Sequence, residues 1–138
     1  MNLRVGSLEM TIALLAVAVV AIRPRVRAAA EVGRLIPMRV VVEAFEPGGP
    51  RTYEGRPPFD VGRDPGADLV LKDPEVSRRH ARFASRNGAV YVEDLASRNG
   101  SFLNGRRIAE AIEVRAGDVV DVGATRLLLR ELEPLEIA

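Results

Sequence analysis

HARFASRNGAVYVEDLASRNGSFLNGRRI, residues 80–108, is the stretch that decides the fold of this chain. It consists of short runs of strand-forming residues separated by turn residues, which is the pattern of short β-strands. Asn-Gly pairs at 87–88 and 104–105 separate these runs. Asn-Gly between two such runs is the strongest short-range signal of a β-hairpin, because both residues accept a positive φ angle. The stretch therefore predicts two hairpins in an all-β protein.

The same punctuation extends outward on both sides, from Met38 to about Glu131. β-branched runs separated by Gly, Pro, Asn and Asp are typical of a sandwich or barrel of many short strands. The candidate strands are residues 38–45, 51–54, 59–62, 68–71, 80–85, 89–94, 101–103, 106–108, 111–114, 119–122 and 126–131. We therefore predict an all-β domain of about eleven strands over residues 38–138.

Composition narrows the function classes. The chain has 138 residues, 47% of them hydrophobic, with a formal net charge of +1. This length fits one domain with a short appendage, and the near-neutral charge argues against a nucleic-acid binder that relies on bulk charge. There is no cysteine and only one histidine, His80. Disulfides, thiolate zinc sites and multi-histidine metal sites are therefore excluded, and we expect no metal and no cofactor.

The N-terminal segment predicts a membrane anchor. Val5–Ile22 is mostly apolar and 18 residues long. Such a helix reaches ~27 Å, enough for a thin bilayer. A soluble core helix is the alternative without a membrane, but residues 13–22 offer no polar face. A cleavable signal peptide is another alternative, supported by the small residues Ala28–Ala30. We predict an anchor over residues 1–22 and a connector over residues 23–37.

Arginines after the apolar run predict its orientation. Arg4 precedes the run, whereas Arg23, Arg25, Arg27 and Arg34 follow it closely. Positive charge stays on the cytoplasmic side of a membrane and opposes translocation of the segment C-terminal to it. We therefore expect a single-pass protein of the inner (plasma) membrane, with its C-terminal domain in the cytoplasm.

Enzyme signatures are scarce. Ser77, His80 and Asp94 invite comparison with a hydrolase triad, but the serine lacks the glycine pattern of a nucleophile elbow. Asp60, Asp64 and Asp68 recur every four residues, yet Pro65 and Gly66 break any helix that would align them, so they are interpreted as turn formers. We predict no catalytic residues and no enzyme activity.

Several loop residues are suited to hold a compact dianion instead. They are Arg63, the run Ser77-Arg78-Arg79-His80, and the run Arg98-Asn99-Gly100-Ser101. Phosphate requires charge-assisted donors that converge from several directions, and Arg, Ser, Asn and backbone N–H groups supply them. Taken singly, each is also explained as a solvated loop residue that keeps the domain soluble.

At these residues the chain resembles the forkhead-associated (FHA) domain, a phosphothreonine-binding β-sandwich of about eleven strands. Gly62-Arg63 is similar to that family's Gly-Arg, and Ser77–His80 is similar to its Ser-x-x-His. Asn99–Gly105 is similar to its Asn-Gly-Thr/Ser-x-hydrophobic-Asn-Gly, with Ser101 where Thr is more frequent. The resemblance covers Met38 to about Glu131.

The resemblance implies a role for each matching residue. Arg63 and Ser77 would contact the phosphate, Arg78 and Arg98 would be further ligands, and Asn99 would bond the backbone of the bound peptide. His80 would be a buried buttress of the Ser77 loop rather than a base. The other residues implied to support the site are Gly62, Gly100, Ser101, Asn104 and Gly105.

The sequence thus predicts a non-catalytic, membrane-tethered reader of phosphothreonine that recruits substrates of a Ser/Thr kinase. We expect the ligand to arrive in trans, because the connector and the residues after Arg130 contain no Ser or Thr. The alternative is a structural interaction module that binds unphosphorylated partners, with its arginines reading acidic side chains.

Overall fold

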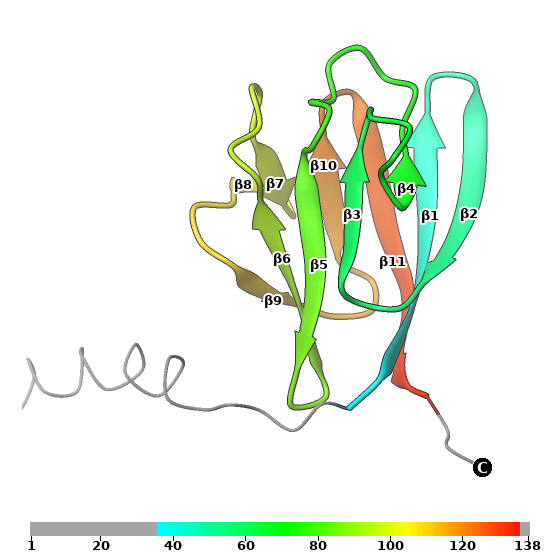
Figure 1. The fold of residues 1–138 in the computed structure, drawn as a ribbon, viewed down its shortest axis with the longest axis vertical. Helices are drawn as coiled ribbons and strands as arrows, with labels where there is room; N and C mark the ends of the chain where they lie inside the picture. Colours follow the sequence, from blue (N-terminus) through cyan, green and yellow to red (C-terminus); the bar gives the residue numbers. More distant parts are fainter. Residues whose placement is uncertain (1–35, 136–138) are drawn as a thin grey trace, which may run out of the picture. The chain divides into compact units, whose positions relative to one another are not determined.

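The computed structural model of the protein describes residues 36–135, which contain eleven β-strands and no α-helix. The strands are β1 (Met38–Glu46), β2 (Gly49–Gly55), β3 (Phe59–Gly62), β4 (Leu69–Val70), β5 (Ala81–Arg86), β6 (Ala89–Asp94), β7 (Ser101–Leu103), β8 (Arg106–Arg107), β9 (Ile112–Val114), β10 (Val119–Val122) and β11 (Thr125–Pro134). Each predicted strand overlaps one of them (Figure 1). The prediction of about eleven strands is confirmed.

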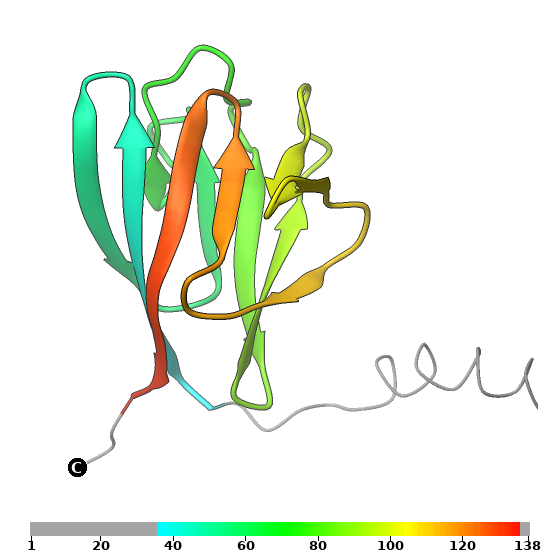
Figure 2. The same cartoon turned by 180° about the vertical axis from the view of Figure 1, so that it is seen from behind.

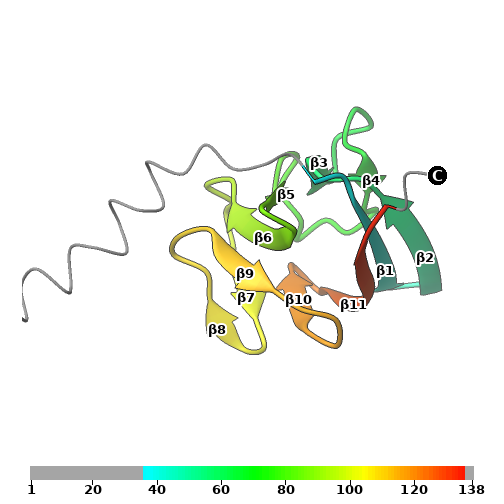
Figure 3. The same ribbon diagram turned by 90° about the horizontal axis from the view of Figure 1, so that it is seen from below.

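The strands form two sheets. One has the order β2-β1-β11-β10-β7-β8 and the other has the order β4-β3-β5-β6-β9. All neighbours pair antiparallel except β3 and β4, which are parallel. Strands β2, β1, β11 and β10 of the first sheet lie in front in Figure 2. Seen from below, β5 and β6 lie in one layer and β10 and β11 in the other (Figure 3). The architecture is a β-sandwich.

Side-chain alternation builds the core between the sheets. Val40, Val42 and Ala44 of β1 are fully buried, while the residues between them face outward. On the facing sheet, Phe59 of β3 and Phe83 of β5 are cross-strand partners, and their buried rings stack with centroids 4.9 Å apart. This is the period-2 pattern that a half-buried strand requires, so a one-residue shift of register would turn each strand inside out.

The two Asn-Gly turns have the expected geometry. Asn87 and Gly88 have φ angles of 52° and 76°, and Asn104 and Gly105 have φ angles of 49° and 85°. Two successive positive φ angles are the mark of a type I′ turn, whose twist matches that of paired strands. The turns close the β5–β6 and β7–β8 hairpins, as the sequence predicts.

Within residues 36–135 there is no helix long and apolar enough to cross a bilayer. The predicted anchor at residues 1–22 and connector residues 23–35 lie outside the described residues.

Candidate functional site

Three loops meet at one end of the sandwich, the upper end in Figure 1. They are the β3–β4 loop (63–68), the β4–β5 loop (71–80) and the β6–β7 loop (95–100). Backbone hydrogen bonds connect the first two: Arg63 N–H donates to Ser77 O at 3.0 Å, and Asp64 N–H donates to Arg78 O at 3.1 Å. The predicted phosphate ligands Arg63 and Ser77, 14 positions apart in sequence, are thereby held side by side.

Gly62 makes this close approach possible. A Cβ atom at Gly62 would lie 2.1 Å from the backbone oxygen of Arg78. Real Cβ atoms do not approach an oxygen so closely, so any larger residue would push the β4–β5 loop away from β3. The glycine before Arg63 is needed for space rather than for a left-handed backbone.

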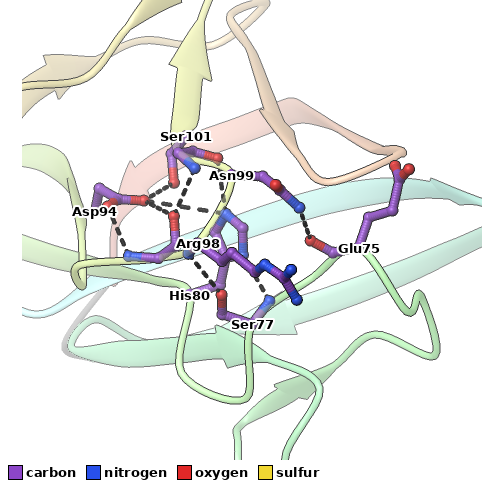
Figure 4. A network of polar contacts seen from close by, with 9 residues as sticks. Glu75, Ser77, His80, Asp94, Arg98, Asn99 and Ser101 are labelled. Carbon is purple, nitrogen blue, oxygen red and sulfur yellow. Dashed lines mark hydrogen bonds and ion pairs between the residues drawn. The ribbon is translucent and has the colours of Figure 1, made fainter.

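His80 joins the second loop to the third. Its side chain is fully buried. Nδ1 accepts a hydrogen bond from Ser77 N–H at 3.0 Å, and Nε2 lies 2.9 Å from the backbone oxygen of Gly100 (Figure 4). Because Nδ1 is an acceptor and Gly100 O can only accept, the proton belongs on Nε2. His80 therefore has the geometry of a neutral support rather than of a base.

Asp94 holds the β6–β7 loop in place next to His80. Its carboxylate accepts hydrogen bonds from Ser97 N–H at 3.0 Å, from Ser97 Oγ at 2.5 Å and from Ser101 Oγ at 2.6 Å (Figure 4). Burial alone raises the pKa of Asp94, but the hydrogen bonds from Ser101 and Ser97 outweigh it, so the pKa is lowered. The buried Ser101 hydroxyl thus fixes the start of β7.

Asp73 does the same for the β4–β5 loop. It is 1% exposed and accepts bonds from Glu75 N–H at 2.9 Å, from Ala124 N–H at 2.8 Å and from Thr125 Oγ1 at 2.8 Å. Burial raises the pKa of Asp73, and these hydrogen bonds more than offset it and lower the pKa. The β4–β5 loop is thereby tied to the β10–β11 turn.

The hydroxyl of Ser77 is bonded as an acceptor. Ser77 Oγ accepts a hydrogen bond from the backbone N–H of Arg98 at 2.9 Å. A serine hydroxyl has one proton to donate, and this contact leaves that proton uncommitted. Arg63 Nε donates to Val76 O at 3.1 Å, which holds its guanidinium group beside the same loop. The guanidinium of Arg98 has no ion-pair partner within residues 36–135.

Asn99, in the β6–β7 loop, connects this loop to the β4–β5 loop. Its Nδ2 donates to Glu75 O at 2.9 Å, which leaves Oδ1 able to accept a hydrogen bond from a bound backbone (Figure 4). Gly100 follows with a φ angle of +83°. An L-residue is strained at this angle, so glycine is needed for the turn.

Three other predicted site residues are not arranged as free ligands or supports of the three loops. Arg78 is exposed and pairs with Asp64 Oδ2 at 3.3 Å, so it would have to leave this partner to bind phosphate. Its role as a ligand stays a prediction. Asn104 and Gly105 lie at the end of β7 away from Gly100, where Asn104 Oδ1 accepts from Val119 N–H at 3.0 Å. They support the β7–β8 hairpin rather than the three loops.

The site presents hydroxyl, amide and guanidinium donors to one exposed surface. Such a set fits a phosphorylated side chain, since a dianion needs several donors at once. Among the described residues there is no group of three or more His, Asp or Glu residues that could hold a metal ion.

Sequence reasoning missed the Asp73 centre. The only local signal was Asp73-Pro74, because Asp before such a turn often accepts backbone N–H bonds. Its partners at 124 and 125 are about 50 positions away and could not be paired with it from sequence.

Comparisons with a family model and with known proteins point to the same domain family. Residues 59–123 match the FHA domain family. The chain is 37% identical over 97 residues to the FHA domain-containing protein FhaB of Mycolicibacterium smegmatis, an alignment that covers 70% of this chain and 63% of that protein. The chain thus matches less than two thirds of the length of this relative.

Solved structures agree with this comparison. The FHA domain of the CT664 protein from Chlamydia trachomatis is 34% identical with a TM-score of 0.60, and the match covers 67% of this chain and 97% of that one. A structure from an analysis of phosphothreonine-dependent FHA domain interactions is 30% identical with a TM-score of 0.62, covering 70% of this chain and 99% of that one.

Proposed function

The chain belongs to the FHA domain family, and from this premise we propose that its sandwich binds phosphothreonine-containing segments of other proteins without catalysing a reaction. The relative analysed for phosphothreonine-dependent interactions supports the proposal, because its FHA domain is matched over 99% of its length.

The observation that carries the proposal is the Ser77–Arg98 contact. Arg98 N–H bonds to Ser77 Oγ at 2.9 Å, which brings the hydroxyl, the Arg98 side chain and the Asn99 amide to neighbouring positions. In this proposal Arg63, Ser77 and Arg98 bind the phosphate, and Asn99 bonds the peptide backbone. Charge-assisted hydrogen bonds from arginine contribute about 1.5 to 3 kcal/mol each, enough to make binding depend on the phosphate.

A three-peptide titration tests the proposal. The full chain, purified in a mild detergent, is titrated calorimetrically with a phosphothreonine peptide, its unphosphorylated twin and a twin with Glu at the same position. We expect the phosphorylated peptide to bind at least about tenfold more tightly than either control, a difference of about 1.4 kcal/mol. Equal affinity for all three would favour a phosphorylation-independent interaction module and overturn the proposal.

We further propose that residues 1–22 tether the domain to the cytoplasmic face of the inner (plasma) membrane. The support is the apolar run Val5–Ile22, followed by Arg23, Arg25 and Arg27. Membrane fractionation and an alkaline phosphatase fusion after Ala138 test this proposal. We expect a membrane-bound protein with an inactive phosphatase, and an active periplasmic fusion would refute the orientation.

The clients proposed are substrates of a Ser/Thr kinase, bound in trans. Pull-down with the full chain from lysate, with and without phosphatase treatment, tests this point by mass spectrometry. We expect proteins that carry mapped phosphothreonines and are lost after phosphatase treatment. The same capture with and without treatment would contradict the proposal.

A further inference from the structure

Arginines in the described residues differ in whether a carboxylate is near them. Several strand arginines are ion-paired, as Arg126 is with Asp121 at 3.0 Å and Arg130 is with Glu43. Arg107 of β8 is exposed, and within residues 36–135 it has no ion-pair partner. Its guanidinium is therefore available to a carboxylate from another molecule, and such planar groups bind carboxylates through two parallel hydrogen bonds.

The Arg107 guanidinium lies against the candidate site. A Cβ atom at Gly100 would be 3.2 Å from both Nε and Cζ of Arg107. Gly100 directly follows Asn99, the residue proposed to bond the peptide backbone. The Arg107 side chain therefore packs over Gly100, in the space next to where a Cβ atom would lie. Arg107 is thus positioned next to the β6–β7 loop of the candidate site.

Arg107 also lines a groove formed by residues of β7, of β8 and of the segment that leads to Ile112 of β9. This groove has a volume of about 840 Å³, and its lining includes Leu103, Arg107, Ile108, Ala109, Ala111 and Ile112. Ile112 is 44% exposed, although it is a large apolar residue of a strand. Apolar side chains gathered at an exposed, charge-rimmed surface are typical of an interaction site.

We propose that Arg107 is a specificity-determining residue that pairs with an acidic side chain flanking the phosphothreonine, while the groove receives an apolar side chain of the same segment. This inference rests on the proposed function. The segment in the groove is the one that carries the phosphothreonine, because Arg107 connects the candidate site to the groove. Its guanidinium lies against Gly100, and its side chain also lines the groove. An extended peptide advances about 3.3 Å per residue, so a few residues beyond the phosphothreonine can follow this surface.

The charges around the groove indicate which residues next to the phosphothreonine would bind best. Arg106 and Arg107 are both exposed on β8, and Arg106 also lines the groove. The two arginines outnumber Glu110, the acidic residue in the groove lining, so an acidic residue followed by an apolar one would match the arginines and the apolar lining in turn. Flank selection of this type adds to the recognition of phosphate without replacing it.

Peptide scanning with matched variants tests the inference. The full chain in detergent is titrated with a labelled phosphothreonine peptide with alanine flanks. In a first series, a single Asp replaces one alanine at each of the five positions before and the five positions after the phosphothreonine. In a second series, a single Leu is moved through the remaining alanine positions of the Asp peptide that binds most tightly. The proteins are the natural chain, Arg107→Gln, Ile112→Ser and the control Arg115→Gln, whose side chain is 82% exposed and lies 3.8 Å from Glu113.

For the natural chain we expect one Asp position to tighten binding about fivefold and one Leu position to add about threefold. The Asp gain, measured as a ratio within each protein, should disappear in Arg107→Gln, and the Leu gain should disappear in Ile112→Ser. Both gains should persist in Arg115→Gln. The Asp gain should also shrink as salt is raised, because exposed ion pairs are screened.

A flat Asp scan in the natural chain would overturn the inference while leaving phosphate recognition intact. A gain that survives Arg107→Gln would overturn it as well. The unphosphorylated alanine-flanked peptide distinguishes failure of the proposed function from failure of this inference alone. If it binds as tightly as the phosphorylated one, the proposed function fails and the inference fails with it.

Discussion

Ser77 and Arg98 are joined by a hydrogen bond of 2.9 Å between the serine Oγ and the arginine backbone N–H, across 21 positions of sequence. Both residues are candidate phosphate ligands, so one ligand fixes the position of the other. The serine hydroxyl accepts from Arg98 while keeping its own proton for the phosphate. The loops are therefore organised for an anion before it binds, which reduces the ordering that binding requires.

This contact predicts the effect of Ser77→Ala. The variant loses a donor to the phosphate and the bond to Arg98, so phosphopeptide affinity should fall at least about tenfold. The fold should persist, because His80 bonds to the backbone N–H of Ser77 rather than to its hydroxyl. Titration calorimetry measures the affinity, and circular dichroism checks the fold. Ser85→Ala, in β5, is the matched control and should bind normally.

Arg63 allows charge and geometry to be separated. Arg63→Ala should weaken phosphopeptide binding at least about tenfold, since it removes a charge-assisted donor. Arg63→Lys keeps the charge but cannot reproduce the Nε bond to Val76 O. Its affinity for the phosphopeptide should therefore lie between that of the natural chain and that of Arg63→Ala. Arg126→Ala, which removes a paired arginine of β11, is the control. Equal loss in the control would mean that only net charge matters.

His80 should contribute mainly to stability. His80→Leu leaves Ser77 N–H and Gly100 O without their partners in a buried place, so the free energy of unfolding should fall by about 2 to 4 kcal/mol. Urea unfolding followed by circular dichroism measures this. Nitrogen NMR of the natural protein should show the neutral ring protonated on Nε2. Unchanged stability of the leucine variant would contradict the bridging role.

Local signals made much of this fold readable from sequence. Apolar runs between turn residues locate the strands, and Asn-Gly pairs locate two hairpins, because both signals depend on residues close in the chain. The resemblance to a family located the loop ligands. The Ala124 and Thr125 partners of Asp73 were not predictable, since they lie about 50 positions away and depend on how two loops approach one another in three dimensions. Nor could the sequence tell that Arg78 is paired with Asp64.

Gly62 is required for space, and this distinguishes it from the turn glycines. Gly62→Ala would place Cβ 2.1 Å from the backbone oxygen of Arg78, and backbone cannot move aside as a flexible side chain does. We expect a loss of about 1 to 3 kcal/mol or more in unfolding free energy, with weaker phosphopeptide binding because the Ser77 loop shifts.

Gly105→Ala is the matched comparison for Gly62→Ala. Its Cβ would meet nothing within 4 Å, but its φ angle of +85° strains an L-residue, so only a modest loss of about 1 kcal/mol is expected and binding should be kept. Urea unfolding and calorimetry on both variants make the comparison. Normal phosphopeptide binding by Gly62→Ala would show that the loop tolerates the displacement.

Asp94 predicts how stability responds to acid. Its pKa in the folded chain is lowered, because the hydrogen bonds from Ser101 and Ser97 outweigh the effect of burial. An unfolded Asp has a pKa of about 3.9. A lowered folded pKa means that the carboxylate contributes stability that is complete above the unfolded pKa and is lost as pH falls through the folded pKa. The relevant window therefore lies below about pH 4, and Asp73, whose pKa is also lowered, adds to the same loss.

Asp94→Asn isolates this contribution. The amide offers one acceptor oxygen in place of two, so the Ser97 and Ser101 donors cannot all be satisfied and the variant should be less stable at pH 7 by about 1 to 3 kcal/mol. Below about pH 4 the gap from the natural chain should narrow, because the natural carboxylate becomes protonated there. Urea unfolding from pH 7 to pH 3 measures the gap. Glu113→Gln, an exposed change, should show none, and a constant gap for Asp94→Asn would mean that its charge has no part in holding the loop.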